Sequence, residues 1–159
     1  MYEIPKFVPL MIGAWGIAQV EGVAVNTVRV RFKRGKLPAV DIAGIDDLGE
    51  RRLRVPGVAL VEKWGGGVEA HNARLLDLAE EESISAEEAA MELSMKVWDL
   101  RSHVGQIVNE DGTVDTNALF SLAGIMRTEF LRSRNLSLGS RNLIWPLYLR
   151  DRSPALAVA

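Results

Sequence analysis

The stretch Gly16 to Val40, GIAQVEGVAVNTVRVRFKRGKLPAV, decides the fold. Its first apolar segment ends at Gly22, and a second apolar pattern follows, with Val28 and Phe32 four residues apart. Residues four apart share one face of a helix, so this spacing predicts two helices that pack on each other across a turn at the glycine. We expect Asn26 to cap the second helix, because Asn is favoured at helix N-termini.

The second predicted helix and its exit carry five cations and no acidic residue. These cations are Arg29, Arg31, Lys33, Arg34 and Lys36. Such a face suits a phosphate backbone, which supplies most of the affinity in non-specific nucleic-acid binding. A solvated charged surface without a ligand is the alternative that the cations alone leave open.

Two strands and a third helix are predicted after the cations. Leu37 to Ile42 and Arg52 to Val55 alternate as strands do, and Ala43 to Glu50 would form the loop between them. A helix can begin at Pro56, and its apolar residues continue to Trp64. The expected order is therefore helix, turn, cationic helix, hairpin, helix.

This order resembles the MerR-like winged-helix domain of phage excisionases, of small regulators and of some phage terminase small subunits. The matching residues are Asn26-Thr27-Val28, the KRGKLPAV turn at Lys33 to Val40, and the RRLRVP strand at Arg51 to Pro56. They fall in about the first two fifths of the chain. The resemblance implies that the second helix enters the major groove of DNA and that the hairpin, or wing, contacts the flanking minor groove or backbone.

By position, the resemblance implies two sets of DNA-contacting residues. The set nearest the base edges is Asn26, Thr27, Arg29 and Arg31. The set that would hold phosphates is Lys33, Arg34, Lys36, Arg51, Arg52 and Arg54. Neutralising about six phosphates predicts a log-log salt dependence with a slope of about -5.

The sequence departs from the family pattern at two places. Glu21 stands where the family usually has an apolar residue before the turn glycine, so we expect Val20 to carry the packing there. Asp46 and Asp47 lie at the expected wing tip and would repel a phosphate. The wing is therefore expected to contact DNA only through its arginine strand.

Charge is unevenly distributed along the chain. The 159 residues have a formal net charge of -2, but residues 1–67 hold ten Lys and Arg against seven Asp and Glu, and the remainder is acidic. Local charge sets the field near a binding face, so the overall value does not exclude nucleic acid. We expect Phe7 to Val25, which Pro9 and glycines interrupt, to be no membrane span and the protein to be cytoplasmic.

Catalytic and metal chemistry have little support in the sequence. The chain has no cysteine, which excludes disulfides and thiolate chemistry, and its two histidines are far apart. We expect His71 at the surface and His103 partly buried. No phosphate loop or paired nucleophile and base is recognisable, so no enzyme activity, metal or cofactor is expected.

The chain is expected to hold two related units. Gly65 to Gly67 predict a flexible joint, and an amphipathic helix follows from Val68 to Glu82. The expected organisation is a winged-helix domain in residues 1–67, a connecting helix in 68–84, a second helix-turn-helix-like domain in 85–135, and a basic and apolar C-terminal tail in 136–159.

The second unit is predicted from a capping box and an offset of about 72 residues. Ser85 with Glu88 three residues later is a helix start signal. At that offset Gly22 falls on Ser94 and Val28 on Leu100. We expect a short hairpin turning at Asp111-Gly112 and a helix capped by Thr116. Its candidate DNA contacts are Lys96 and Arg101; a copy used only for packing or pairing is the alternative.

Together these patterns predict a mainly α fold with short β-hairpin wings, a tandem winged helix-turn-helix. The expected function is double-stranded DNA binding, as a transcriptional regulator or an excisionase-like architectural factor of phage or plasmid type. Alternatives are a packaging protein like a terminase small subunit, or a protein-binding inhibitor or adaptor. Besides DNA, the expected partners are a second copy of the chain or another protein bound through the C-terminal half.

Overall fold

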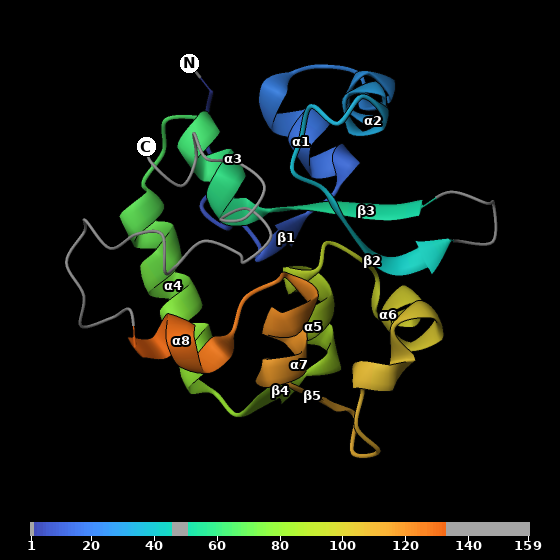
Figure 1. Cartoon of the computed structure of the whole chain (residues 1–159), viewed down its shortest axis with the longest axis vertical. Coiled ribbons are helices and arrows are strands. Elements are labelled where there is room, and N and C mark those ends of the chain that lie inside the picture. The colour runs from blue at the N-terminus through green and yellow to red at the C-terminus, as the bar shows by residue number, and fades with distance from the viewer. Residues whose placement is uncertain (1, 46–50, 133–159) are drawn as a thin grey trace.

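The computed structural model describes residues 2–45 and 51–132. Within them the chain is a mixed α/β protein in which short helices pack around small antiparallel sheets (Figure 1), as the predicted helices and hairpins require. No described helix combines the length and the apolar character needed to cross a membrane. In chain order the elements are β1 (Met11–Ile12), α1 (Ala14–Glu21), α2 (Val25–Lys33), β2 (Val40–Ile45), β3 (Arg51–Pro56), α3 (Gly57–Lys63), α4 (Val68–Glu80), β4 (Ser83–Ser85), α5 (Ala86–Glu92), α6 (Val97–His103), the 3-10 helix η1 (Gly105–Ile107), β5 (Thr113–Asp115), α7 (Thr116–Leu122) and α8 (Arg127–Arg132).

The first sheet has β3 at its centre, between β1 and β2. The pairing of Val40 with Arg54 confirms the predicted hairpin, but its first strand runs from Val40 to Ile45 and not from Leu37 to Ile42, so it includes residues expected in the loop. The expected tip residues Asp46 and Asp47 lie outside the described residues. The pairing of Ile12 with Val55 adds a third strand that the sequence analysis did not predict. Only two residues of β1 are paired, too few to show an alternating pattern.

Two hydrophobic clusters form the interior. The N-terminal cluster includes Ile17, Ala18 and the fully buried Val28, and Phe32 packs against it, as predicted. The larger C-terminal cluster is built around Leu100 and Phe120 and also takes in residues from the first unit. The residues that cross over are Leu10, Met11 and Ile42. The first unit therefore contributes to both cores.

Gly65 to Gly67 form a tight turn between α3 and α4. Gly65 has a φ of 75°, which favours glycine, and the Gly66 N–H donates to the carbonyl of Val61 at 2.9 Å. A Cβ on Gly66 would lie 2.2 Å from Cδ1 of Ile4. Left-handed backbone and close approach thus explain two of the glycines that predicted a flexible joint.

The first half of each unit repeats with the predicted offset. α1 begins at Ala14 and α5 at Ala86, 72 residues later. α2 and α6, which begin at residues 25 and 97, keep the same offset. The turns also correspond, because Gly22 and Ser94 both have positive φ, 67° and 54°. The two helix pairs therefore share their spacing and a left-handed residue in the turn.

The helices in the second half of each unit also correspond, with an offset of 59 residues that the sequence analysis did not find. α3 begins at Gly57 and α7 at Thr116, while α4 and α8 begin at residues 68 and 127. The Gly57 N–H donates to Leu10 O, and the Thr116 N–H donates to Glu82 O in the equivalent place. The shorter offset arises at the wing: in place of β2 the second unit has η1 and a single Val108–Val114 bridge. Residues 82–130 therefore follow the element order of residues 10–71 in a shortened form.

The helix starts agree only partly with the predictions. Ser85 accepts the Glu88 N–H at 3.1 Å, which confirms it as the cap of α5, whereas the Glu88 carboxylate accepts the Ser85 hydroxyl and not the backbone N–H that a capping box uses. Asn26 does not cap α2, because the helix begins at Val25 after Ala24, and Asn26 lies in its first turn. Likewise Asp115 caps α7, whereas the buried Thr116 donates its hydroxyl to backbone carbonyls of residues 81 and 82. The short hairpin that turns at Asp111-Gly112 is confirmed.

Candidate nucleic-acid interface

Helix α2 presents polar and cationic side chains on the face opposite the core. Val28 is 0% exposed and fixes the inner face, so its neighbours on the outer face point away from the cluster. Asn26, Thr27, Arg29 and Lys33 are all exposed. Arg34 and Lys36 follow at the exit of the helix and are exposed as well.

A groove runs between α2, the start of α1 and strand β3. It has a volume of about 740 Å³, and none of its described lining residues is acidic. Its cations come from two elements, Arg29 and Lys33 from α2 and Arg52 and Arg54 from β3. The exposed Trp15, at 74%, lines it from the first turn of α1. This groove therefore offers positive charge and an aromatic ring to a ligand.

Trp15 is a residue of this groove that sequence reasoning did not assign to the site. Trp15 is the single large side chain in the run Gly13 to Gly16. This contrast is the signal by which the sequence could have indicated an exposed ring, because an aromatic residue among small ones in a first turn is free to project outward.

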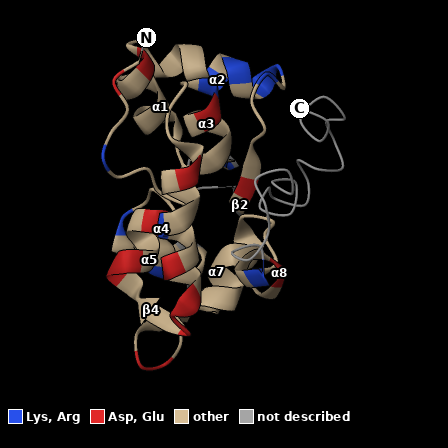
Figure 2. Ribbon diagram, turned by 90° about the vertical axis from the view of Figure 1, so that its left-hand side faces the viewer, with Lys and Arg blue, Asp and Glu red and all other residues tan. Residues whose placement is uncertain are grey.

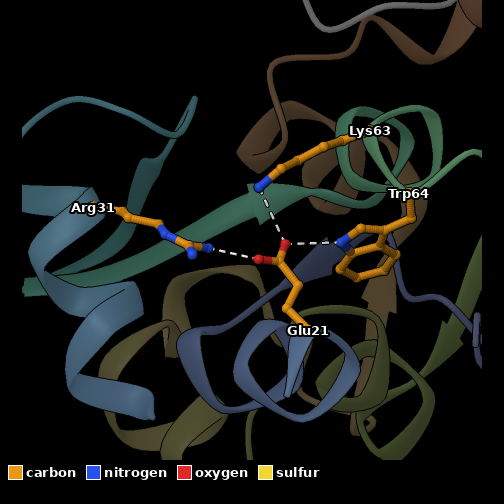
Figure 3. A network of polar contacts seen from close by, with 4 residues as sticks. All are labelled: Glu21, Arg31, Lys63 and Trp64. Carbon is orange, nitrogen blue, oxygen red and sulfur yellow. Dashed lines mark hydrogen bonds and ion pairs between the residues drawn. The ribbon is translucent and has the colours of Figure 1, made fainter. Parts of the chain in front are cut away.

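Arg31 lies apart from the other α2 cations and binds the protein's own carboxylate. Its guanidinium lies 2.6 Å from Glu21, whose side chain is only 2% exposed. Glu21 also accepts hydrogen bonds from Lys63 at 3.2 Å and from the indole N–H of Trp64 at 2.9 Å (Figure 3). The expected contact between Arg31 and a base edge thus competes with a structural ion pair.

This network determines the charge state of Glu21. Burial alone would raise the pKa of the carboxyl group, but the hydrogen bonds from Trp64, Arg31 and Lys63 outweigh it and hold the pKa below its usual value. Glu21 is therefore ionised at neutral pH, and it anchors α1 to both α2 and α3. Val20 is partly buried and packs against the N-terminal cluster as expected, and the Glu21 carboxylate next to it is buried by its own contacts.

Arg52 and Arg54 of the wing contact the second unit. Arg52 lies 3.6 Å from the carboxylate of Asp99 on α6. Arg54 donates to the carbonyl oxygens of Leu93 at 2.9 Å and Ser94 at 3.1 Å. Burial lowers the pKa of Arg54, Arg52 lowers it further and Asp99 raises it, although an arginine stays protonated at neutral pH. Their expected phosphate contacts therefore compete with contacts inside the protein.

The other residues named by the sequence analysis are not among the described residues that line the groove. Lys96 and Arg101 are exposed on the second unit, at the start and in the middle of α6. The side chain of Arg51 is outside the described part of the chain, as is that of His103. His71 is buried, not at the surface as expected, because α4 places its ring beside Gly57.

The charges are separated along the molecule. Figure 2 shows Lys and Arg on α2 at one end and Asp and Glu gathered on α5 and around β4 at the other. This pattern agrees with the basic first part and acidic remainder of the sequence. A polyanion that approached the molecule would be attracted to the α2 end and repelled from the opposite end.

Comparison of the chain with protein-family models, with curated proteins and with solved structures finds no match.

Proposed function

We propose that this protein binds double-stranded DNA through α2, and that its two units are tandem helix-turn-helix domains of which the first carries a wing. The observation that supports the proposal is the groove between α2 and β3, which is lined by four cations and by no described acidic residue. Phosphate oxygens are the ligands that such a surface attracts most strongly.

The dimensions of α2 suit the major groove. An α-helix with its side chains is about 10–12 Å across, and the major groove of B-DNA is about 12 Å wide, so a helix such as α2 can enter it. Asn26, Thr27 and Arg29 lie in the first half of the helix, where they would contact base edges. Lys33, Arg34 and Lys36 lie at its end, where they would hold phosphates.

For the biological process, we propose regulation or architectural assistance to recombination. A packaging protein is the alternative within the same fold. Ring-shaped oligomers in solution would favour packaging, whereas a monomer or dimer on DNA would favour a regulator or architectural factor.

Binding-site selection from a random duplex library tests the proposal. Arg29→Ala is compared with Arg101→Ala, the equivalent position of the second unit 72 residues later. We expect Arg29→Ala to cost about 1–3 kcal/mol and to relax the preference at one or two base pairs. Arg101→Ala should select the same sequence as the wild type. Failure of the wild-type protein to enrich any duplex would exclude the function.

A protein-binding role is the second candidate, favoured by the surface of the second unit. Met91 on α5 and Trp98 on α6 are 59% and 68% exposed, and acidic side chains are nearby in the sequence. Large exposed apolar side chains are enriched at protein interfaces. Capture of a defined basic partner that Met91→Ser and Trp98→Ser abolish, without any duplex binding, would select this role.

A further inference from the structure

The turn of the second unit lies against the wing of the first. Figure 1 shows α6 beside the outer part of the β2–β3 hairpin, with α5 below β3. Three contacts join these elements: Arg54 to the end of α5, Ser94 to β1, and Arg52 to α6. All three involve the turn and the helix of the second unit that correspond to the DNA-reading parts of the first.

The contact of Arg54 satisfies the end of helix α5. Carbonyl groups at a helix C-terminus have no partner within the helix, and a cation there is also stabilised by the helix dipole. The Arg54 guanidinium donates to one such carbonyl, that of the C-cap residue Leu93, and to the carbonyl of Ser94 in the turn that follows. The wing strand is thus fixed to the second unit by two directed hydrogen bonds.

Ser94 adds a second contact from the same turn. It has a φ of 54°, in the left-handed region where glycine is favoured, and its counterpart in the first unit is the glycine Gly22. The Ser94 hydroxyl donates to the carbonyl of Met11 in β1 at 2.6 Å. The side chain therefore has a role that a glycine could not fill.

The third contact uses the outer face of α6. At the offset of 72, Asp99 takes the place of Thr27, and it pairs with Arg52 of the wing. The cations of the first unit are mostly replaced: at that offset Arg31, Lys33, Arg34 and Lys36 correspond to His103, Gly105, Gln106 and Val108. Arg101 alone keeps the charge of its counterpart, Arg29.

We propose that the second unit is a brace that holds the wing of the first unit in position, and that it is not a second reader of DNA. Its positioning residues are Ser94, whose hydroxyl binds β1, and Asp99, which pairs with Arg52 of the wing. Arg54 of the wing is held by the carbonyls at the end of α5 and in the turn after it. The proposal that each chain reads one DNA site rests on the proposed function; the brace itself does not.

Amide hydrogen exchange of the free protein tests the brace. The variant Ser94→Gly with Asp99→Asn keeps the left-handed turn and removes the two side-chain contacts. We expect amides of β2 and β3 to exchange about tenfold faster, while those of α4 keep their rates. The charge swap Arg52→Asp with Asp99→Arg should restore most of the protection that Arg52→Asp alone removes. Unchanged wing amides, or an equal acceleration in α4, would overturn the brace.

Hydroxyl-radical footprinting tests the DNA part on the duplex enriched by the wild-type protein. The brace variant should lose the flanking protection given by the wing and keep the central block given by α2. The double variant Lys96→Ala with Arg101→Ala should keep both. Loss of a separate block of protection in that double variant would show that the second unit reads DNA. If the wild type enriches no duplex, the proposed function fails and the exchange experiment alone decides the brace.

Discussion

Glu21 illustrates how partners distant in the sequence determine the role of one side chain. Its carboxylate accepts hydrogen bonds from Lys63 and Trp64, which lie 42 and 43 residues further along the chain. The local pattern indicated only that a charged residue stood in an apolar position. In the second unit that position is held by Leu93, which is fully buried. The site therefore accepts either an apolar side chain or a carboxylate with its own donors.

Replacement of Glu21 tests this explanation. Glu21→Ala should lower the free energy of unfolding by about 2 kcal/mol, since it leaves the Trp64 N–H without an acceptor and opens space. Glu21→Leu, the residue of the second unit, should cost less than Glu21→Ala. Urea denaturation at neutral pH measures both variants. Equal losses would contradict the view that the position tolerates an apolar side chain.

His71 gives the protein a pH-dependent stability. Burial, and then the nearby Arg74, lower its pKa from 6.5 to about 4, so the folded protein keeps it neutral. The unfolded chain takes up a proton at a higher pH, and stability therefore falls as pH drops from about 6.5 to about 4. A shift of this size corresponds to about 3 kcal/mol.

The variant His71→Leu isolates this effect. Nε2 of His71 is buried without a hydrogen-bond partner among the described residues, so an apolar side chain loses no polar contact there. Between pH 7 and pH 4 the variant should lose about 3 kcal/mol less stability than the wild type, measured by urea denaturation at each pH. Parallel curves for the two proteins would refute the assignment to His71.

At the scale of elements, local signals predicted the helices and non-local pairing determined the rest. The spacing of Val28 and Phe32 and the Ser85 cap depend on neighbours within four residues, and both predictions are confirmed. Strand β1 depends on pairing with residues more than forty positions away, which no local pattern reports. The same limit applies to the groove: its α2 cations were predicted, whereas the internal contacts of Arg52 and Arg54 required the second unit to be in place.

The cap of α5 provides a prediction for an element. Ser85→Ala removes the acceptor for the Glu88 N–H and should destabilise the protein by about 1 kcal/mol. Ser83→Ala, two residues earlier on the exposed end of β4, is the matched control and should cost less than about 0.5 kcal/mol. Thermal unfolding of the two variants side by side measures the difference. A loss at Ser85 no larger than at Ser83 would mean that the cap does not stabilise α5.

At the scale of the whole molecule, the cations of the groove belong mainly to the first of two units that share one element order. The first unit carries the groove and the second carries the acidic surface and the contacts to the wing (Figure 2). This division explains how a chain with a net charge of -2 can present a cationic face to a polyanion. The internal contacts of Arg31, Arg52 and Arg54 also reduce the number of cations that are free for phosphates.

The salt dependence of binding to a mixed-sequence duplex is the most direct test of the DNA interface. On a duplex of mixed sequence Arg29 has no specific base to bind, so it is counted as a phosphate contact together with Lys33, Arg34 and Lys36. These four exposed cations predict a log-log slope of about -3.6, shallower than the value of about -5 for six phosphate contacts. Arg29→Ala with Lys33→Ala should bring the slope to about -2, because two of the four contacts are removed. An affinity that does not change with salt, or a slope that the double variant leaves unchanged, would contradict the claim that α2 binds the duplex.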